Sequence, residues 1–138
     1  MPGITAASGC AAYAGIPLTH RDVAQSCVFV TGHQSAEGGD VDWRSLAVAN
    51  QTLVIYMGLG ALAGICQALM QHGLDEQTPL AVIERGTMRT QKVTEGSLAA
   101  MAQGSHQDFR SPGLVIIGEV VRLRSRLGWF ENYDSPPF

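Results

Sequence analysis

The sequence has little charge and little cysteine. Only 15% of its 138 residues are Asp, Glu, Lys or Arg, and the net charge is −3. No positive field therefore attracts nucleic acid or an acidic membrane surface. The three cysteines, Cys10, Cys27 and Cys66, lie far apart and form no CxxC pair. This usage is typical of a reducing cytosol rather than of a disulfide-stabilised secreted domain.

Long apolar runs are also missing. The longest stretch, residues 53–69, is interrupted by glycines and by Gln67, so it is too mixed to span a bilayer. The N-terminus has no basic region followed by an apolar run, which is the pattern of a signal peptide. We therefore expect a cytoplasmic protein with no nucleic-acid partner and no membrane partner.

The sequence lacks the common catalytic and metal-binding patterns as well. His33, His72 and His106 occur singly, without an HExxH motif or the His/Cys spacing of a zinc site. There is no Ser–His–Asp signature and no obvious acid–base pair of carboxylates. We therefore predict no metal site and no catalytic residue in this chain.

Apolar segments with strand character alternate with segments of helical spacing. Such alternation predicts an α/β fold, with a mixed and mostly buried sheet of about five strands flanked by helices. The segment 52–57 is almost continuously apolar, as expected for a strand covered on both faces. The predicted strands are 27–31, 52–57, 79–84, 91–96 and 114–120, and the predicted helices are 5–14, 43–49, 61–72, 97–103 and 121–127.

A glycine cluster follows the second predicted strand. Gly58, Gly60 and Gly64 have the spacing GxGxxxG, which differs from the GxGxxG dinucleotide fingerprint. No acidic residue follows about twenty positions later, where a ribose partner is expected. The cluster therefore favours a tight strand-to-helix turn and close helix packing over dinucleotide binding.

Short motifs along nearly the whole chain resemble one family. They are PGITAASGC at 2–10, GIPLTHRD at 15–22, VTGH at 30–33, YMG at 56–58, RGT at 85–87 and VIIGEVV at 115–121. In this order they resemble the uroporphyrinogen-III C-methyltransferases, within the tetrapyrrole methylases. The resemblance implies methyl transfer from S-adenosylmethionine to uroporphyrinogen III, giving precorrin-2 for siroheme or cobalamin synthesis.

The resemblance also implies a cofactor site made by Thr5, Ala6, Met57 and Gly86. A polarizable methionine suits the neighbourhood of a sulfonium, and a glycine lets the backbone approach the adenosyl group. Without the resemblance, Met57 would be the end of a core strand and Gly86 a turn between strands. Thr5 would be a helix N-cap and Ala6 a helix contact, which are roles compatible with cofactor contact.

Arg21 resembles a substrate-side arginine. Uroporphyrinogen carries eight carboxylates, and a guanidinium is a natural partner for them. The structural alternative is a surface ion pair between Arg21 and Asp22, which would contribute little to stability.

The resemblance places residues 1–130 in the C-terminal domain of a tetrapyrrole methylase and leaves residues 131–138 as a flexible tail. The family's N-terminal domain, with its proposed catalytic aspartate, is absent from this sequence, so we expect the fragment to be inactive alone. Low charge and an apolar bias suit a homodimer. Two alternatives stay open: a non-catalytic cofactor-wall or dimerisation module, and a methylase acting on a later corrin precursor.

Overall fold

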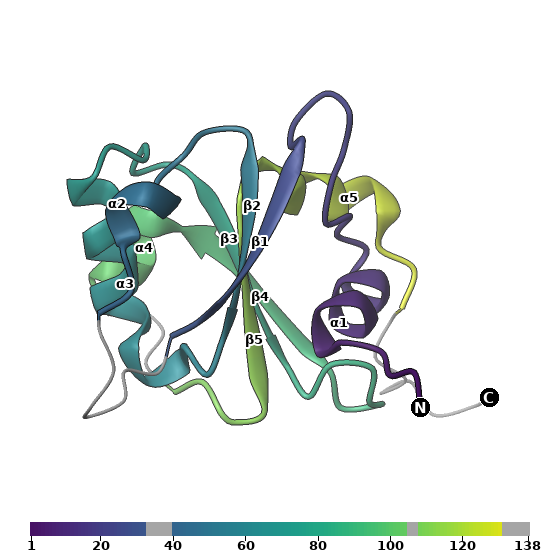
Figure 1. Cartoon of the computed structure of the whole chain (residues 1–138). Coiled ribbons are helices and arrows are strands. Elements are labelled where there is room, and N and C mark those ends of the chain that lie inside the picture. The colour runs from purple at the N-terminus through teal and green to yellow at the C-terminus, as the bar shows by residue number, and fades with distance from the viewer. Residues whose placement is uncertain (33–39, 105–107, 131–138) are drawn as a thin grey trace.

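The computed structural model describes residues 1–32, 40–104 and 108–130. A five-stranded mixed sheet forms the middle of three layers (Figure 1). The strand order is β1-β2-β5-β3-β4, with β1 and β2 parallel and every other neighbouring pair antiparallel. The strands are β1 (Ser26–Thr31), β2 (Gln51–Tyr56), β3 (Pro79–Glu84), β4 (Lys92–Ser97) and β5 (Gly113–Ile117). This arrangement confirms the predicted fold class.

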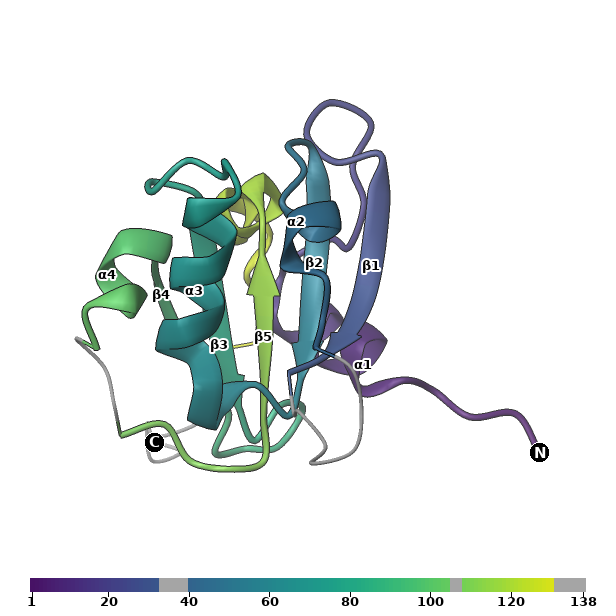
Figure 2. The same ribbon diagram turned by 60° about the vertical axis from the view of Figure 1, so that its left-hand side comes forward.

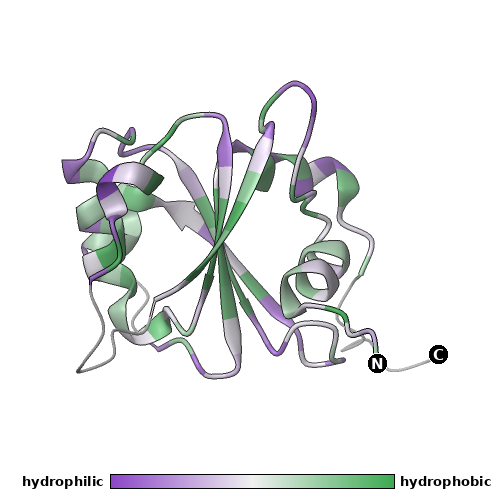
Figure 3. Ribbon diagram, viewed as in Figure 1, coloured by the Kyte–Doolittle hydropathy of each residue, from purple (hydrophilic) through white to green (hydrophobic). Residues whose placement is uncertain are grey.

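The central strands are apolar along their length because they face two cores. In β5, Leu114 and Ile116 belong to the core on one face of the sheet, whereas Val115 and Ile117 belong to the core on the other. Every residue of β3 is buried, and the middle four residues of β2 are buried too. Figure 3 shows the same apolar character along the sheet. The run predicted at 52–57 therefore forms a strand covered on both faces up to Tyr56, whereas Met57 lies outside the strand and is exposed.

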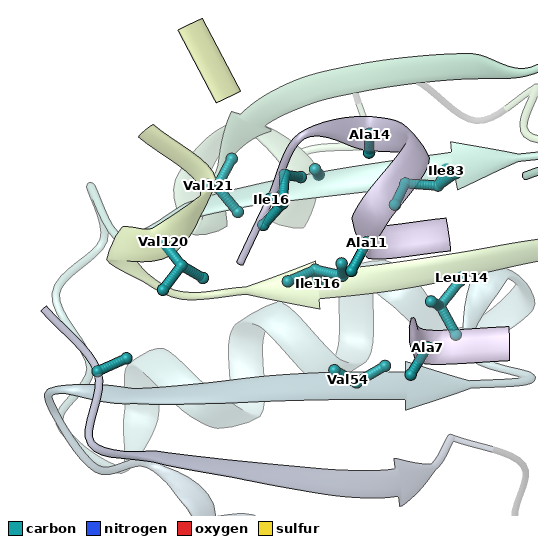
Figure 4. Packing of buried hydrophobic residues seen from close by; sticks show 12 residues of the cluster. Ala7, Ala11, Ala14, Ile16, Val54, Ile83, Leu114, Ile116, Val120 and Val121 are labelled. Atoms are coloured by element: carbon teal, nitrogen blue, oxygen red, sulfur yellow. The ribbon is translucent and has the colours of Figure 1, made fainter. Parts of the chain in front are cut away.

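One face of the sheet is covered by α1 and by the C-terminal helical turns (Figures 1 and 4). Ala7, Ala11 and Ala14 of α1 are all at most 2% exposed, and these small side chains let the helix approach the sheet closely. Figure 4 shows Ala7 and Ala11 beside Leu114 and Ile116 of β5. The elements of this layer are α1 (Ala6–Ala14), the 3₁₀ helix η2 (Glu119–Leu123) and α5 (Arg124–Leu127).

The opposite face is covered mainly by α3 and α4, which lie side by side in Figure 2. Ile65, Cys66 and Leu69 of α3 are at most 3% exposed and pack into the second core. Burial raises the pKa of the Cys66 thiol to about 12, so this cysteine behaves as a small apolar core residue. The elements of this layer are α2 (Trp43–Leu46), the 3₁₀ helix η1 (Leu59–Ala61), α3 (Leu62–Gln71) and α4 (Leu98–Ala102).

Two helix boundaries are set by local chemistry. Gly15 ends α1 in the left-handed conformation, with φ of 68°, and its N–H donates to the carbonyl of Ala11. The Asp42 carboxylate caps α2 by accepting from the Ser45 N–H at 3.2 Å. Thr5 occupies the predicted N-cap position of α1 with extended backbone, but its side chain makes no cap hydrogen bond.

The last predicted strand and helix end differently in the structure. β5 stops at Ile117 because Gly118 turns the chain with φ of 141°, a conformation that favours glycine. Val120 and Val121 then turn back into the core as part of η2 instead of extending the strand. The predicted helix 43–49 is only the single turn α2, and the predicted strand 91–96 is shifted by one residue in β4.

The glycine cluster after β2 forms the predicted tight turn. A Cβ on Gly58 would lie 2.6 Å from the Ile55 side chain, so close packing requires glycine there. A Cβ on Gly60 or Gly64 would meet nothing within 4 Å, so the predicted close packing holds at Gly58 alone.

Some of the predictions from the sequence concern residues that the structure does not describe. His33, His106 and the tail 131–138 belong to this group. Within residues 1–32, 40–104 and 108–130, no helix is long and apolar enough to cross a membrane. The same residues hold no group of three His, Cys, Asp or Glu side chains that could share a metal ion.

Candidate functional site

A cleft of about 360 Å³ opens where β2 and β3 end and β5 begins. In open α/β sheets, ligands bind at the carboxyl ends of the strands, and β2 and β3 both end at this cleft. Helix α1 contributes two residues to its lining. The cleft is lined by Ala6, Cys10, Tyr56, Met57, Ile83, Gly86, Ser111, Pro112, Gly113 and Leu114.

The cleft brings together three predicted cofactor residues that are far apart in the sequence. Ala6 comes from the first turn of α1, Met57 from the end of β2, and Gly86 from the turn after β3. Thr5, the fourth predicted residue, is adjacent to Ala6, and its hydroxyl lies in hydrogen-bonding contact with the Tyr56 hydroxyl. The structure therefore gathers all four predicted cofactor residues at one edge of the sheet.

The backbone is in an unusual conformation on two sides of this cleft. Met57, Arg85 and Thr87 all have positive φ, at 52°, 49° and 69°. Asn50 is the other non-glycine residue with positive φ among those described. Left-handed backbone costs free energy for residues with a side chain, and such conformations concentrate at ligand sites. At Met57 this turn leaves the side chain 66% exposed instead of buried in the core.

Gly86 lies against α1. A Cβ added to Gly86 would overlap the Cys10 thiol and would lie 3.4 Å from the Ile83 side chain. Glycine is therefore needed for the close approach between the β3–β4 turn and the helix. A hydrogen-bonded chain holds this turn, in which the Thr87 N–H donates to the Gln91 carboxamide at 2.8 Å. The Gln91 amide in turn donates to the Tyr13 carbonyl of α1 at 3.3 Å.

The cleft presents a neutral wall. The ten described residues that line it include no Asp, Glu, His, Lys or Arg. Burial raises the pKa of the Cys10 thiol, which therefore stays protonated at neutral pH. A second hollow of about 550 Å³ lies on the other side of Met57, over Gly32, Trp43, Gly60 and the small residues at the start of α3. The exposed Met57 side chain thus borders two hollows.

Arg21 lies away from this cleft. It belongs to the connection between α1 and β1, at the amino ends of β1 and β2, where the Gln25 N–H donates to the Asn50 carbonyl. The six residues of β2 separate that end of the sheet from Met57. The ion pair with Asp22, the structural alternative for Arg21, is not formed: among the described residues, Asp22 approaches His20 at 3.9 Å, and no carboxylate pairs with Arg21.

Three residues of the site were not predicted from the sequence. The Tyr56 hydroxyl accepts a hydrogen bond from the start of α1, and Cys10 lines the cleft. Gln91 is a buried polar residue, only 3% exposed, whose carboxamide joins α1 to the β3–β4 turn. Tyr56 and Cys10 occur within the motifs YMG and PGITAASGC, which were the available signals. Gln91 had no such signal, because it only appears as the polar start of a weak strand pattern.

Comparisons with known proteins identify the family of the chain. The family model described as Tetrapyrrole (Corrin/Porphyrin) Methylases matches residues 1–102. Siroheme synthase 2 of Aeromonas hydrophila is 57% identical over 130 residues, covering 94% of this chain and 27% of that protein. Siroheme synthase of Escherichia coli O139:H28 is 53% identical over 133 residues, covering 96% of this chain and 29% of that protein. The chain therefore spans less than a third of these curated relatives.

Solved structures show the same similarity. The uroporphyrin-III C-methyl transferase of Thermus thermophilus, complexed with S-adenyl homocysteine, superposes with a TM-score of 0.78 at 34% identity. The match covers 89% of this chain and 51% of that one. A cobalt precorrin-4 methyltransferase has the same fold, with a TM-score of 0.76 at 18% identity. S-adenosylmethionine is the methyl donor of the family. By sequence and by fold, the chain belongs to the tetrapyrrole methylases.

Proposed function

We propose that this chain forms one wall of the S-adenosylmethionine site in an enzyme that methylates uroporphyrinogen III. The observation that carries the proposal is the cleft, where Ala6, Met57 and Gly86 meet and Thr5 is adjacent. Relatives named siroheme synthase and a neighbour named uroporphyrin-III C-methyl transferase support this substrate class. The product would be precorrin-2, a precursor of siroheme and cobalamin.

The residues of the cleft fit the methyl donor. The space is small and largely apolar, which suits the adenosyl group, and Gly86 and Cys10 meet on its wall. When bound, S-adenosylmethionine supplies an electrophilic methyl group on a positively charged sulfur. The polarizable Met57 side chain and the Tyr56 ring are favourable neighbours for such a cation, and no fixed positive charge in the lining repels it.

In this proposal the chain contributes binding, orientation and exclusion of water. Methyl transfer to a pyrrole carbon needs carbon, methyl and sulfur in line, and holding reactants in such a geometry lowers the barrier substantially. Met57 lines both hollows, so in this proposal its side chain contacts the donor in one and lies beside the macrocycle in the other, leaving the line of transfer open. The methylated ring must then lose a proton, and the neutral lining residues include no base suited to accept it at neutral pH.

Arg21 enters the proposal as a substrate contact of the assembled enzyme. Within one copy of the chain it lies at the other end of β2, so it cannot act in the same cleft as Met57. Arg21→Ala should raise the KM for uroporphyrinogen III about tenfold in the assembled enzyme, because a charge-assisted hydrogen bond to a carboxylate is lost. Its affinity for S-adenosylhomocysteine should not change. An unchanged KM would assign Arg21 to the solvated surface.

The chain by itself is then a cofactor-binding module instead of a complete catalyst. The lack of an acid–base group among the described cleft residues favours this second candidate function. The first candidate, one wall of a methyltransferase, requires a further domain that supplies the catalytic groups. The second candidate, a cofactor-binding module, requires only this chain.

Calorimetric titration with S-adenosylhomocysteine tests the cofactor wall. The wild-type chain should bind, and Met57→Ala should weaken binding about tenfold through the loss of apolar contact, equivalent to ~1.4 kcal/mol. Val48→Ala is a matched control, because Val48 is also an exposed apolar residue, at 48%, but lines a hollow at the other end of the sheet. Equal affinities in the wild type and Met57→Ala would contradict the proposed site.

A further inference from the structure

The start of α1 is held by a side chain from a distant strand. Helices begin with N–H groups that lack a partner within the helix, and a Ser, Thr, Asp or Asn at the N-cap commonly accepts from one of them. Thr5 occupies the N-cap position with extended backbone, but its side chain makes no cap bond. Instead, the Ala7 N–H donates to the Tyr56 hydroxyl oxygen at 3.1 Å, across 49 residues of sequence.

The bond between Ala7 and Tyr56 is buried at its Ala7 end, whereas Tyr56 itself is half-buried. Ala7 is fully buried, so its N–H would lack any partner without the tyrosine hydroxyl. An unpaired buried donor costs the full desolvation free energy of the group, which exceeds the net contribution of an ordinary hydrogen bond. The same hydroxyl contacts the Thr5 hydroxyl, so one atom of Tyr56 holds both the residue before the helix and its second residue.

Tyr56 is fixed independently of α1. It is the last residue of β2, its carbonyl accepts from the Gly32 N–H at 2.7 Å, and its ring packs edge-on against Phe29 with centroids 6.3 Å apart. Met57 follows directly with positive φ. The position of the tyrosine hydroxyl is therefore set by the same strand end that sets the position of Met57.

We propose that the Tyr56 hydroxyl is a positioning group that fixes Thr5 and Ala6 relative to Met57 across the cleft. The importance of this spacing for the methyl donor rests on the proposed function, whereas the capping of α1 does not. Tyr56 acts through its contact with the first turn of α1. Because the bond crosses from one wall of the cleft to another, its loss moves the two walls relative to each other.

The test is the variant Tyr56→Phe, which keeps the aromatic ring and its contact with Phe29 but removes the hydroxyl. Amide hydrogen exchange, followed by NMR on the 138-residue chain, should become at least tenfold faster at Ala7. Proton–proton contacts between the aromatic ring at position 56 and the first turn of α1 should weaken. The affinity for S-adenosylhomocysteine should fall three- to tenfold, as expected for one lost hydrogen bond that acts through position. Tyr13→Phe is the matched control, because it removes the hydroxyl of the other described tyrosine, near the far end of α1, and should change none of these readouts.

The possible failures are distinguishable. Unchanged exchange at Ala7 in Tyr56→Phe would overturn the capping and with it the proposal. Faster exchange with unchanged ligand affinity would overturn the positioning role while leaving the proposed cofactor site intact. If the wild-type chain fails to bind S-adenosylhomocysteine, the proposed function fails for the isolated chain. The positioning role is then tested only by the NMR contacts between the aromatic ring at position 56 and the first turn of α1. If Tyr56→Phe keeps all of these contacts, the positioning role is overturned.

Discussion

Gly86 is explained by a contact that could not be anticipated from its motif. From the RGT motif we expected a glycine whose missing side chain makes room for the adenosyl group. The structure adds that a Cβ at this position would overlap the Cys10 thiol, so the glycine also lets α1 lie against the β3–β4 turn. Both residues line the cleft. Packing and ligand access are therefore coupled at this one position.

Substitutions at both positions separate packing from ligand contact. Gly86→Ala should lower the free energy of unfolding by about 1–3 kcal/mol, as overpacked sites do, and should weaken S-adenosylhomocysteine binding. Adding Cys10→Ala removes the overlapping thiol, so the double variant should regain most of the lost stability. Its affinity should stay below that of Cys10→Ala alone, because the new methyl group still narrows the cleft. Denaturant unfolding and calorimetry measure the two effects. Affinity that recovers together with stability would remove Gly86 from the ligand contacts.

At the scale of elements, α1 is docked by interactions that are long-range in sequence. The Tyr56 hydroxyl holds its start, Gln91 holds the Tyr13 carbonyl near its end, and the Trp129 indole donates to the Ala12 carbonyl at 2.9 Å. The helix itself is short and rich in alanine, so its packing and these bonds fix its place more than its intrinsic helix propensity does. The proposed cofactor residues Thr5 and Ala6 depend on this docking.

The elements of the sheet were predictable because burial on both faces leaves a strong apolar pattern. The strand 79–84 was predicted with its observed bounds, since every residue of β3 is buried. The strand 114–120 was predicted too long because Val120 is as apolar as Ile117, although it enters the core from η2 after the turn at Gly118. Apolar content alone does not distinguish a residue that continues the strand from one that enters the core after a turn.

The site was predictable only in part, because some of its contacts join residues that are far apart in the sequence. The resemblance named Met57 and Gly86, and the structure brings both to one cleft. The distant bonds of Tyr56 and Gln91 could not be read from the sequence, because nothing local marks which helix a hydroxyl or a carboxamide will reach. Arg21 shows the opposite case, in which a motif with a good chemical rationale lies at the other end of the sheet.

Gly15 is the position where the end of α1 is most sensitive to substitution. Its φ of 68° favours glycine, and a Cβ would lie 2.6 Å from the Gly128 backbone nitrogen, which has little freedom to move. Gly15→Ala should therefore destabilise the chain by about 2–4 kcal/mol, combining backbone strain with overpacking. Gly64→Ala is the matched control: it lies inside α3 with open space around it, so alanine should stabilise by roughly 0.5–1 kcal/mol. Thermal unfolding of both variants checks the difference, and equal effects would contradict this account of Gly15.

At the scale of the whole molecule, the sheet has an edge suited to association. β1 is an edge strand with no charged residue and no proline, and Phe29 on it is 52% exposed. Natural edge strands usually carry charged residues or proline, which prevent pairing with the edge of another chain. We therefore expect sedimentation at micromolar concentration to show a dimer or a larger species. Phe29→Lys adds a charge to this edge and should shift the chain toward monomer. A wild-type chain that stays monomeric over this range would contradict the expected homodimer.

The most general prediction concerns activity. Methylation of a pyrrole carbon ends with the loss of a proton, and the described lining of the cleft contains only neutral groups, with the pKa of the Cys10 thiol raised further by burial. Labelled S-adenosylmethionine and uroporphyrinogen III should therefore give no methylated product with this chain alone. Adding the N-terminal domain of a family member should restore turnover, because that domain would supply the missing acid–base groups and the other wall. The same mixture made with Met57→Ala should turn over more slowly, which would show that the restored activity uses this cleft. Product formed by the purified 138-residue chain alone would contradict the proposed division of roles between the two domains.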